Sequence, residues 1–303
     1  MPPRAGPSRL PAVTVLLLVV MVVAVVGTAF SLNASQSELR FRDAESLGLG
    51  AAFGAGFGGA GEYSKIEMAA LSGPLPTDAA DVAVPVLMYH YVDDEPPPAG
   101  PYADGLTVRT PDFVEEMEYL VTNGYETVGL DDVYLALAGL RELPAKPVIL
   151  TFDDGGLDNY EVAFPLLQKY GLKGTFFVIT RAVGEEGSMD WDHLREMVAA
   201  GMAVQSHTVS HPDLTRIPAE RLQTELADSR DAISEATGEV GYALSYPGGA
   251  YNETVIEAAR AAGYVMAVTT DGGAALGPES LFEITRKRVQ PFLPMATFAR
   301  LVD

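Results

Sequence analysis

One short stretch constrains the fold of this chain more than any other. Residues 148–155 read Val-Ile-Leu-Thr-Phe-Asp-Asp-Gly, an apolar run that ends in two adjacent carboxylates and a glycine. Such a run is typical of a buried parallel strand, and α/β proteins carry their catalytic groups at the carboxyl ends of such strands. Because two neighbouring carboxylates raise each other's pKa unless a cation neutralises one, Asp153 and Asp154 indicate a metal site.

Alternating strand and helix patterns surround this stretch from Pro85 onward. We expect further strands at 85–92, 174–180, 202–207, 242–246, 264–270 and 284–290, and helices at 111–123, 131–141, 160–170, 191–200, 218–237, 252–262 and 295–302. Strands separated by helices predict βα units and a parallel sheet. About seven such units favour a barrel over an open sheet. None of the expected helices is opened by a Gly-x-Gly-x-x-Gly pattern, which disfavours a dinucleotide-binding fold.

The N-terminal residues predict export. Residues 1–11 carry two arginines and no acid, and residues 12–30 run for 19 positions without a charge. About 20 apolar residues cross a bilayer as a helix, whereas the apolar part of a cleaved signal peptide spans about 7–15 residues. We therefore expect a signal anchor over residues 1–30, with the rest of the chain outside the cytoplasm. A cleaved signal peptide, which leaves the protein secreted, and a buried core helix are the alternatives.

Composition indicates how the rest of the chain is divided and which partners and sites it excludes. Residues 31–84 include a Gly- and Ala-rich segment that is typical of a flexible linker. The alternative is that Phe53 and Phe57 dock on the domain or on the membrane. Residues 85–303 form the expected catalytic domain. The net charge of −21 argues against a nucleic-acid partner. The chain has no cysteine, which excludes disulfides, thiolate metal sites and a Cys nucleophile.

Two of the four histidines, His207 and His211, lie in a second motif. The motif reads Ser-His-Thr-Val-Ser-His-Pro over residues 206–212 and follows an expected strand, so it also belongs at a strand's carboxyl end. Imidazole is the commonest metal ligand in proteins, and two imidazoles with one carboxylate form a facial set that leaves positions open. The alternative is a pair of hydrogen-bonded loop histidines with no metal.

The two motifs together, at residues 151–155 and 206–211, resemble the polysaccharide deacetylase family, the family-four carbohydrate esterases. The resemblance covers residues 85–289 in motif order and spacing. It implies a distorted (β/α)7 barrel and an N-acetylated glycan substrate. It also implies that Asp153 is the general base, and that a divalent metal, usually Zn²⁺ with Co²⁺ or Ni²⁺ as other candidates, is bound by Asp154, His207 and His211.

A third motif is weaker. Residues 246–252 resemble the family's Arg-x-Pro-Tyr-Gly loop, in the form found in exported poly-N-acetylglucosamine deacetylases. Ser245 stands where many members have Arg, and Gly248 stands where they have Tyr. The backbone N–H of Gly248 can still serve the oxyanion, and Tyr251 is assigned to the same substrate loop. Arg286 matches a late arginine of this subgroup and could orient the base, with a surface strand residue as the alternative.

The acid that protonates the leaving amine is expected to be His90. It lies in Tyr-His-Tyr at the end of the first strand, as in related exported deacetylases, and its alternative role is that of a hydrogen-bonded structural histidine. His193 is expected to be a residue of a helix start. Gly156 stands where the family often has Tyr, which predicts the absence of one sugar-contacting ring.

These residues predict a membrane-tethered, extracytoplasmic, metal-dependent deacetylase of N-acetylglucosamine-containing polysaccharide. A deacetylase of peptidoglycan or of a small amide is the alternative among enzymes. A catalytically silent surface glycan-binding domain is the alternative outside enzymes, although binding alone does not need both a base and a metal.

Overall fold

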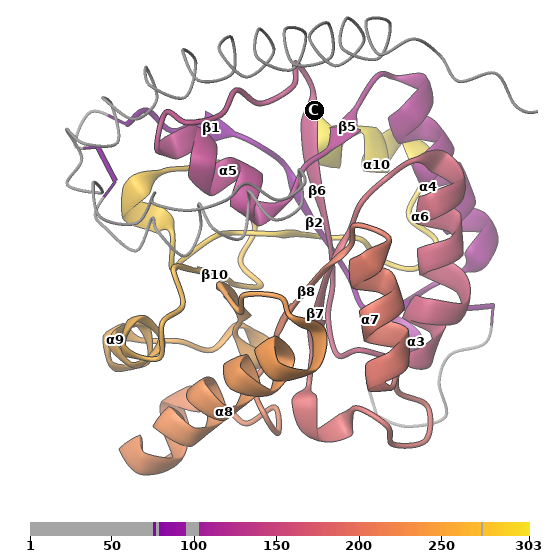
Figure 1. The fold of residues 1–303 in the computed structure, drawn as a ribbon. Coiled ribbons are helices and arrows are strands. Elements are labelled where there is room, and N and C mark those ends of the chain that lie inside the picture. Colours follow the sequence, from indigo (N-terminus) through magenta and orange to yellow (C-terminus); the bar gives the residue numbers. More distant parts are fainter. Residues whose placement is uncertain (1–74, 77–78, 95–102, 274) are drawn as a thin grey trace, which may run out of the picture. The chain divides into compact units, whose positions relative to one another are not determined.

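The structure is a computed structural model that describes residues 75–76, 79–94, 103–273 and 275–303 (Figure 1). All of these residues belong to the compact unit Gly58–Asp303. The expected anchor at residues 12–30 and most of the expected linker lie outside the described residues. Within the part of the chain that the structure describes, no helix has the length and apolar character needed to span a bilayer.

A parallel sheet carries the fold, as the sequence predicts. Its strands follow the order β10 (Met266–Val268), β9 (Ala243–Ser245), β8 (Ala203–Ser206), β7 (Thr175–Val178), β6 (Pro147–Phe152), β2 (Val86–Tyr89) and β12 (Lys287–Arg288). A short strand, β5 (Glu126–Thr127), pairs with the start of β6. Every one of these pairings is parallel, so the carboxyl ends of the strands meet at one edge.

One segment joins the two ends of this sheet. Ile284 forms a parallel bridge with Val268 of β10, and a few residues later Lys287 pairs with Leu87 of β2. The same segment therefore pairs with both end strands, in agreement with the distorted barrel that the resemblance implies. Arg286 lies between these two pairings, where its side chain is completely buried.

Helices connect the strands, and each of them except the short α3, which the sequence pattern does not predict, overlaps one of the expected helix ranges. They are α3 (Ala103–Leu106), α4 (Thr110–Thr122), α5 (Leu130–Leu137), α6 (Phe164–Tyr170), α7 (Trp191–Ala199), α8 (Ala219–Thr237), α9 (Glu253–Ala261) and α10 (Met295–Val302). Helix α4 contacts α6 and α10, and α8 contacts α7 and α9 (Figure 1). Helix α8 ends at Gly238, whose φ of 73° lies in the left-handed region that glycine adopts without strain.

The expected first strand, residues 85–92, is divided in two. Strand β2 ends at Tyr89 and pairs with β6, whereas Tyr91 and Val92 form β3, which pairs with β4 (Thr107–Val108). His90 occupies the break between them. A short antiparallel pair, β1 (Val82–Ala83) with β11 (Ala275–Leu276), adds a further ladder that the sequence pattern does not predict.

Stacked aromatic rings support the strand ends beneath the two aspartates. The ring of Phe152 stacks on Tyr89 at 5.2 Å between centroids and on Phe176 at 4.6 Å, and all three side chains are fully buried. Such pairs add about 0.5–1.5 kcal/mol each beyond the burial of their area. This packing joins β2, β6 and β7 immediately before Asp153 and fixes where that side chain begins.

Candidate active site

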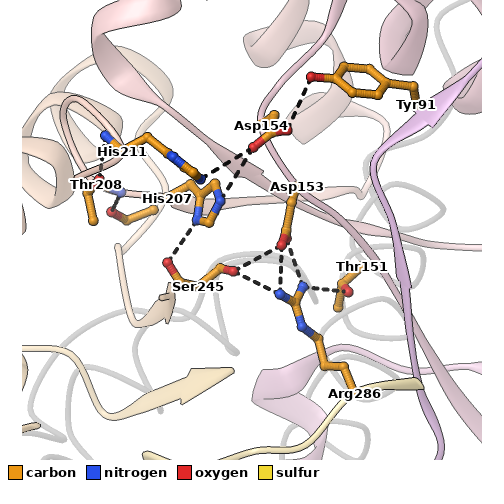
Figure 2. Close-up of polar contacts among 10 residues, drawn as sticks. Tyr91, Thr151, Asp153, Asp154, His207, Thr208, His211, Ser245 and Arg286 are labelled. Carbon is orange, nitrogen blue, oxygen red and sulfur yellow. Dashed lines mark hydrogen bonds and ion pairs between the residues drawn. The ribbon is translucent and has the colours of Figure 1, made fainter. Parts of the chain in front are cut away.

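Five of the expected site residues meet at the carboxyl edge of the sheet, namely Asp153, Asp154, His207, His211 and Arg286 (Figure 2). Asp153 and Asp154 follow β6, His207 follows β8, and Ser245 is the last residue of β9. Arg286 reaches the same place from the segment that precedes β12. Parallel strands thus assemble residues that are far apart in the sequence.

Asp154, His207 and His211 form a cluster with the composition of a metal site. One potential ligand atom from each lies within 4.8 Å of the others. Oδ1 of Asp154 is 3.5 Å from Nε2 of His207 and 3.8 Å from Nε2 of His211. Tetrahedral zinc with bonds of about 2.0–2.2 Å separates neighbouring ligands by roughly 3.3–3.6 Å. The spacing of these three groups therefore fits a divalent ion.

The orientation of His207 also suits a metal ligand. Its Nδ1 lies 2.8 Å from the carbonyl oxygen of Ser245, to which an Nδ1–H can donate. That hydrogen bond leaves the lone pair of Nε2 facing Asp154, the arrangement in which a neutral imidazole binds a metal. Burial opposes protonation of His207, but the nearby charges of Asp153 and Asp154 outweigh burial and raise its pKa. The same carboxylates favour any cation at this place.

The backbone of the cluster adopts uncommon conformations. Asp154, Thr208 and His211 have φ angles of 77°, 68° and 57°, in the left-handed region that residues other than glycine rarely occupy. Such residues gather at functional sites, where the surrounding structure holds them. Here the backbone N–H of His211 donates to Oγ1 of Thr208, and the N–H of Thr208 donates to Oγ of Ser206, both at 3.0 Å.

Helix α8 anchors the loop between the two histidines. Glu225, which is 4% exposed, accepts hydrogen bonds from the backbone N–H of Ser210 at 2.8 Å and from its hydroxyl. Arg221, one turn earlier on the helix, lies 3.4 Å from the same carboxylate. The carboxylate therefore ties the residue before His211 to a long, well-packed helix.

Asp153 is paired with Arg286 in the interior. Nη1 of Arg286 donates to Oδ1 at 2.7 Å and Nη2 donates to Oδ2 at 2.6 Å, a bidentate ion pair between residues that are 1% and 2% exposed. The hydroxyl of Ser245 also donates to Oδ2 at 3.2 Å. Burial alone would raise the pKa of Asp153, but the Arg286 guanidinium outweighs burial and holds that pKa well below its usual range. Asp153 is therefore an ionised carboxylate at neutral pH.

Arg286 is itself held by three further groups. Its Nε donates to the carbonyl oxygen of Thr269 at 2.8 Å, its Nη1 donates to Oγ1 of Thr151 at 3.1 Å, and its Nη2 donates to Oγ of Ser245 at 3.0 Å. A surface position for Arg286, the alternative considered from the sequence, does not fit this burial. The short side chain of Ser245 leaves the space in which the guanidinium lies.

His90 borders the same site. It is half-buried at the end of β2, and the charges of Asp153, Asp154 and Arg286 all act on it. Burial lowers its pKa, and the two carboxylates oppose that shift. Its carbonyl oxygen accepts a hydrogen bond of 2.8 Å from Asn159, which fixes the backbone at the break between β2 and β3. Its role as the acid stays a prediction.

The third motif forms a loop after β9. Gly248 has a φ of 62°, and Gly249 follows with a φ of 74° at a position where a Cβ would lie 2.1 Å from Oγ1 of Thr270. The ring of Tyr251 stacks on Tyr246 at 5.1 Å, and its hydroxyl donates to Glu283 at 3.0 Å. These contacts fix the loop against residue 283, while the roles assigned to Gly248 and Tyr251 stay predictions.

The remaining histidine is a residue of a helix start, as expected. His193 lies in the first turn of α7, where its Nδ1 accepts from the N–H of Asp190 and its own N–H donates to the Asp190 carboxylate. Its ring also stacks on Tyr160 at 4.1 Å.

Three residues of the site were not predicted from the sequence. Ser245 was interpreted only as a lost arginine, yet it contacts both Asp153 and His207. Glu225 lies in an amphipathic helix pattern where an acid gives no signal. Tyr91 follows His90 directly, but its contact with Asp154 depends on the strand break that the pattern does not reveal.

The fold and the site together define a class of hydrolase. A parallel α/β sheet presents a buried, arginine-paired carboxylate beside a carboxylate–imidazole set, which is suited to activating water against an acyl group. Comparison with known proteins narrows this class. The sequence profile described as polysaccharide deacetylase matches residues 141–267.

YxkH of Bacillus subtilis (strain 168) is 33% identical to this chain over 220 residues, and its name assigns it to the polysaccharide deacetylases. The match covers 73% of this chain and 76% of YxkH. The solved structure of the Streptococcus pyogenes deacetylase PplD in complex with acetate is 31% identical in sequence to this chain, with a TM-score of 0.68. The match covers 74% of this chain and 100% of that one. The poly-β-1,6-N-acetyl-D-glucosamine N-deacetylase of Escherichia coli (strain K12) is 37% identical over 86 residues, 28% of this chain and 12% of that protein. The chain belongs to the polysaccharide deacetylase family, and its activity is deacetylation of polysaccharide.

Proposed function

We propose that this protein is a metal-dependent deacetylase that removes N-acetyl groups from a polysaccharide containing N-acetylglucosamine and releases acetate. One observation carries the proposal. The buried ion pair of Asp153 with Arg286 lies directly beside the cluster of Asp154, His207 and His211. A base and a metal site in contact are what amide hydrolysis needs, and binding alone needs neither.

In this proposal Asp154, His207 and His211 hold the divalent ion, with Zn²⁺ as the first candidate and Co²⁺ or Ni²⁺ as others. When bound, the ion supplies Lewis-acid chemistry to the acetamide carbonyl and to water. Asp153 accepts the proton of the attacking water. Arg286 keeps Asp153 ionised and fixes the direction of its oxygens, because both guanidinium nitrogens engage them.

Two further groups complete the proposed chemistry. The N–H of Gly248 stabilises the negative charge that develops on the acetyl oxygen. His90 donates a proton to the leaving amine. Burial lowers its pKa, and the neighbouring carboxylates of Asp153 and Asp154 oppose that shift and favour the protonated form that this role needs. Tyr251 contributes to the substrate loop, which its ring and hydroxyl help to fix.

The substrate class rests on the acetamide chemistry of the site and on the family. The E. coli relative, whose name gives poly-β-1,6-N-acetyl-D-glucosamine as its substrate, supports a poly-N-acetylglucosamine substrate for this chain. We further propose that the domain acts outside the cytoplasm, anchored through residues 12–30 or released after cleavage. The charge-free span with arginines before it supports this location.

Acetate release tests the proposal. The purified 303-residue protein is incubated with poly-N-acetylglucosamine, chitooligosaccharide, peptidoglycan and a small acetamide, each with and without a chelator. We expect acetate from the N-acetylglucosamine polymers, loss of that activity with the chelator, and recovery after Zn²⁺ is restored. Acetate from peptidoglycan or the small amide alone would replace the proposed substrate, and no acetate from any of them would contradict enzymatic function.

A further inference from the structure

The two oxygens of Asp154 have different partners. Oδ1 faces Nε2 of His207 at 3.5 Å and Nε2 of His211 at 3.8 Å. Oδ2 instead accepts a hydrogen bond of 3.2 Å from the hydroxyl of Tyr91, which approaches from the side opposite the histidines (Figure 2). The hydroxyl therefore occupies one carboxylate oxygen and leaves the other directed at the place where a metal would bind.

The ring of Tyr91 lies on the backbone of Gly156. A Cβ at position 156 would lie 3.2 Å from Cδ1 and Cε1 of Tyr91 and 2.4 Å from Oδ1 of Asp158. Both distances are shorter than ordinary Cβ contacts, so a side chain at position 156 would force Asp158 to move and would also press against the ring. The absence of a side chain at 156 thus makes the space that Tyr91 fills.

The same turn also fixes the strand that carries Tyr91. The backbone N–H of Val92 donates to Oδ2 of Asp158 at 2.6 Å. On the other side of Tyr91, the carbonyl oxygen of His90 accepts from Nδ2 of Asn159 at 2.8 Å. Tyr91 is therefore held before and behind by residues 158 and 159, and its hydroxyl is pre-positioned at Asp154 rather than free to turn away.

We propose that Tyr91 is a positioning residue of the metal site, whose hydroxyl makes Asp154 present Oδ1 to the ion, and that the glycine at position 156 is required for this arrangement. The inference rests on the metal site of the proposed function. Groups that hydrogen-bond a metal ligand fix its orientation, and their loss typically weakens metal binding about 10–100-fold. Tyr91 acts through Asp154 and takes no part in proton transfer.

The test measures metal affinity rather than turnover. The Zn²⁺-loaded 303-residue protein and its Tyr91→Phe variant are titrated with a chelator of known affinity, and the Zn²⁺ released is measured. Tyr91→Phe removes the hydroxyl and keeps the ring, so we expect the Kd for Zn²⁺ to rise about 10-fold or more with little change in thermal stability after metal removal. Tyr160→Phe is the matched control, because it removes a hydroxyl that donates to Glu196 on the surface. That variant should bind Zn²⁺ like the unaltered protein.

A second variant reaches the same contact from the other side. Gly156→Ala should move Asp158 and press on the ring, and so weaken Zn²⁺ binding. Adding it to Tyr91→Phe should weaken binding by less than the two separate effects combined, because both disturb the same contact between Tyr91 and Asp154. A Kd unchanged in Tyr91→Phe would overturn the inference while leaving the proposed function intact. Failure of the unaltered protein to bind Zn²⁺ would overturn both.

Discussion

Replacing Arg286 by Met should expose how strongly the interior depends on one ion pair. Met approximates the length of the arginine stem but offers no donor to Asp153, which would keep only the hydroxyl of Ser245 at 3.2 Å. Both members of the pair are buried, at 1% and 2% exposure, so water cannot replace the lost guanidinium. Removing one partner of a buried pair typically costs about 3–5 kcal/mol of unfolding free energy.

The unfolding free energy lost in Arg286→Met should become smaller as the pH falls. In the unaltered protein the pKa of Asp153 is depressed, so its contribution to stability is present above the unfolded pKa and is lost only as pH falls through the lower folded value. Without the guanidinium, burial is opposed chiefly by the charge of His207 and raises the pKa of Asp153 relative to the native value. Protonation then relieves the unpaired charge, so the stability difference between the two proteins should shrink as pH falls from 7 toward 4.

Urea unfolding at several pH values measures both effects, with bound metal and acetate release recorded on the same samples. Arg109→Met is the matched control, because Arg109 also forms a bidentate pair, with Asp112, but on the surface. That variant should unfold like the unaltered protein. A loss below about 1 kcal/mol for Arg286→Met, the same at every pH, would refute the assignment of Arg286 as the partner that keeps Asp153 ionised.

Two further buried carboxylates give predictions of their own. Burial raises the pKa of Glu116 to about 8, and Tyr89 donates a hydrogen bond of 3.0 Å to its carboxylate. The protein should therefore lose stability as pH rises from the unfolded pKa of about 4.3 through about 8, and Glu116→Gln should remove that pH dependence in urea unfolding. An unchanged pH dependence in the variant would contradict this prediction. Glu225→Gln replaces one of the two oxygens that accept from Ser210 by an NH2 group and removes the charge from the other. Unfolding free energy should therefore fall by about 1–3 kcal/mol, and Zn²⁺ should be released to a chelator more readily. Unaltered Zn²⁺ release would show that α8 does not hold the metal loop.

The sheet, the helices and the core of the site could be predicted because their signals are local. An apolar run followed by two aspartates, or by two histidines, identifies a strand end without any knowledge of its neighbours. The parallel pairing then follows from the alternation of strands and helices. That is why Asp153, Asp154, His207 and His211 could be placed at one edge before the structure was known.

The contacts that tune the site could not be predicted, because they join distant segments. Ser245 looks like a lost cation in the sequence, yet the guanidinium that contacts it comes from Arg286, 41 residues later. Tyr91 reaches Asp154, 63 residues away, only because the expected first strand breaks at His90. Each of these contacts depends on backbone positions that tertiary packing determines.

The division of labour between the two neighbouring aspartates tests the account most directly. Asp153→Asn is nearly isosteric but cannot accept a proton, so acetate release should be abolished while bound Zn²⁺ stays near that of the unaltered protein. Asp154→Asn removes a charged ligand, so Zn²⁺ affinity should fall about 10-fold or more together with activity. Bound zinc measured in both purified variants decides the matter. Zinc lost from Asp153→Asn but kept by Asp154→Asn, or full acetate release from either variant, would contradict the roles assigned here.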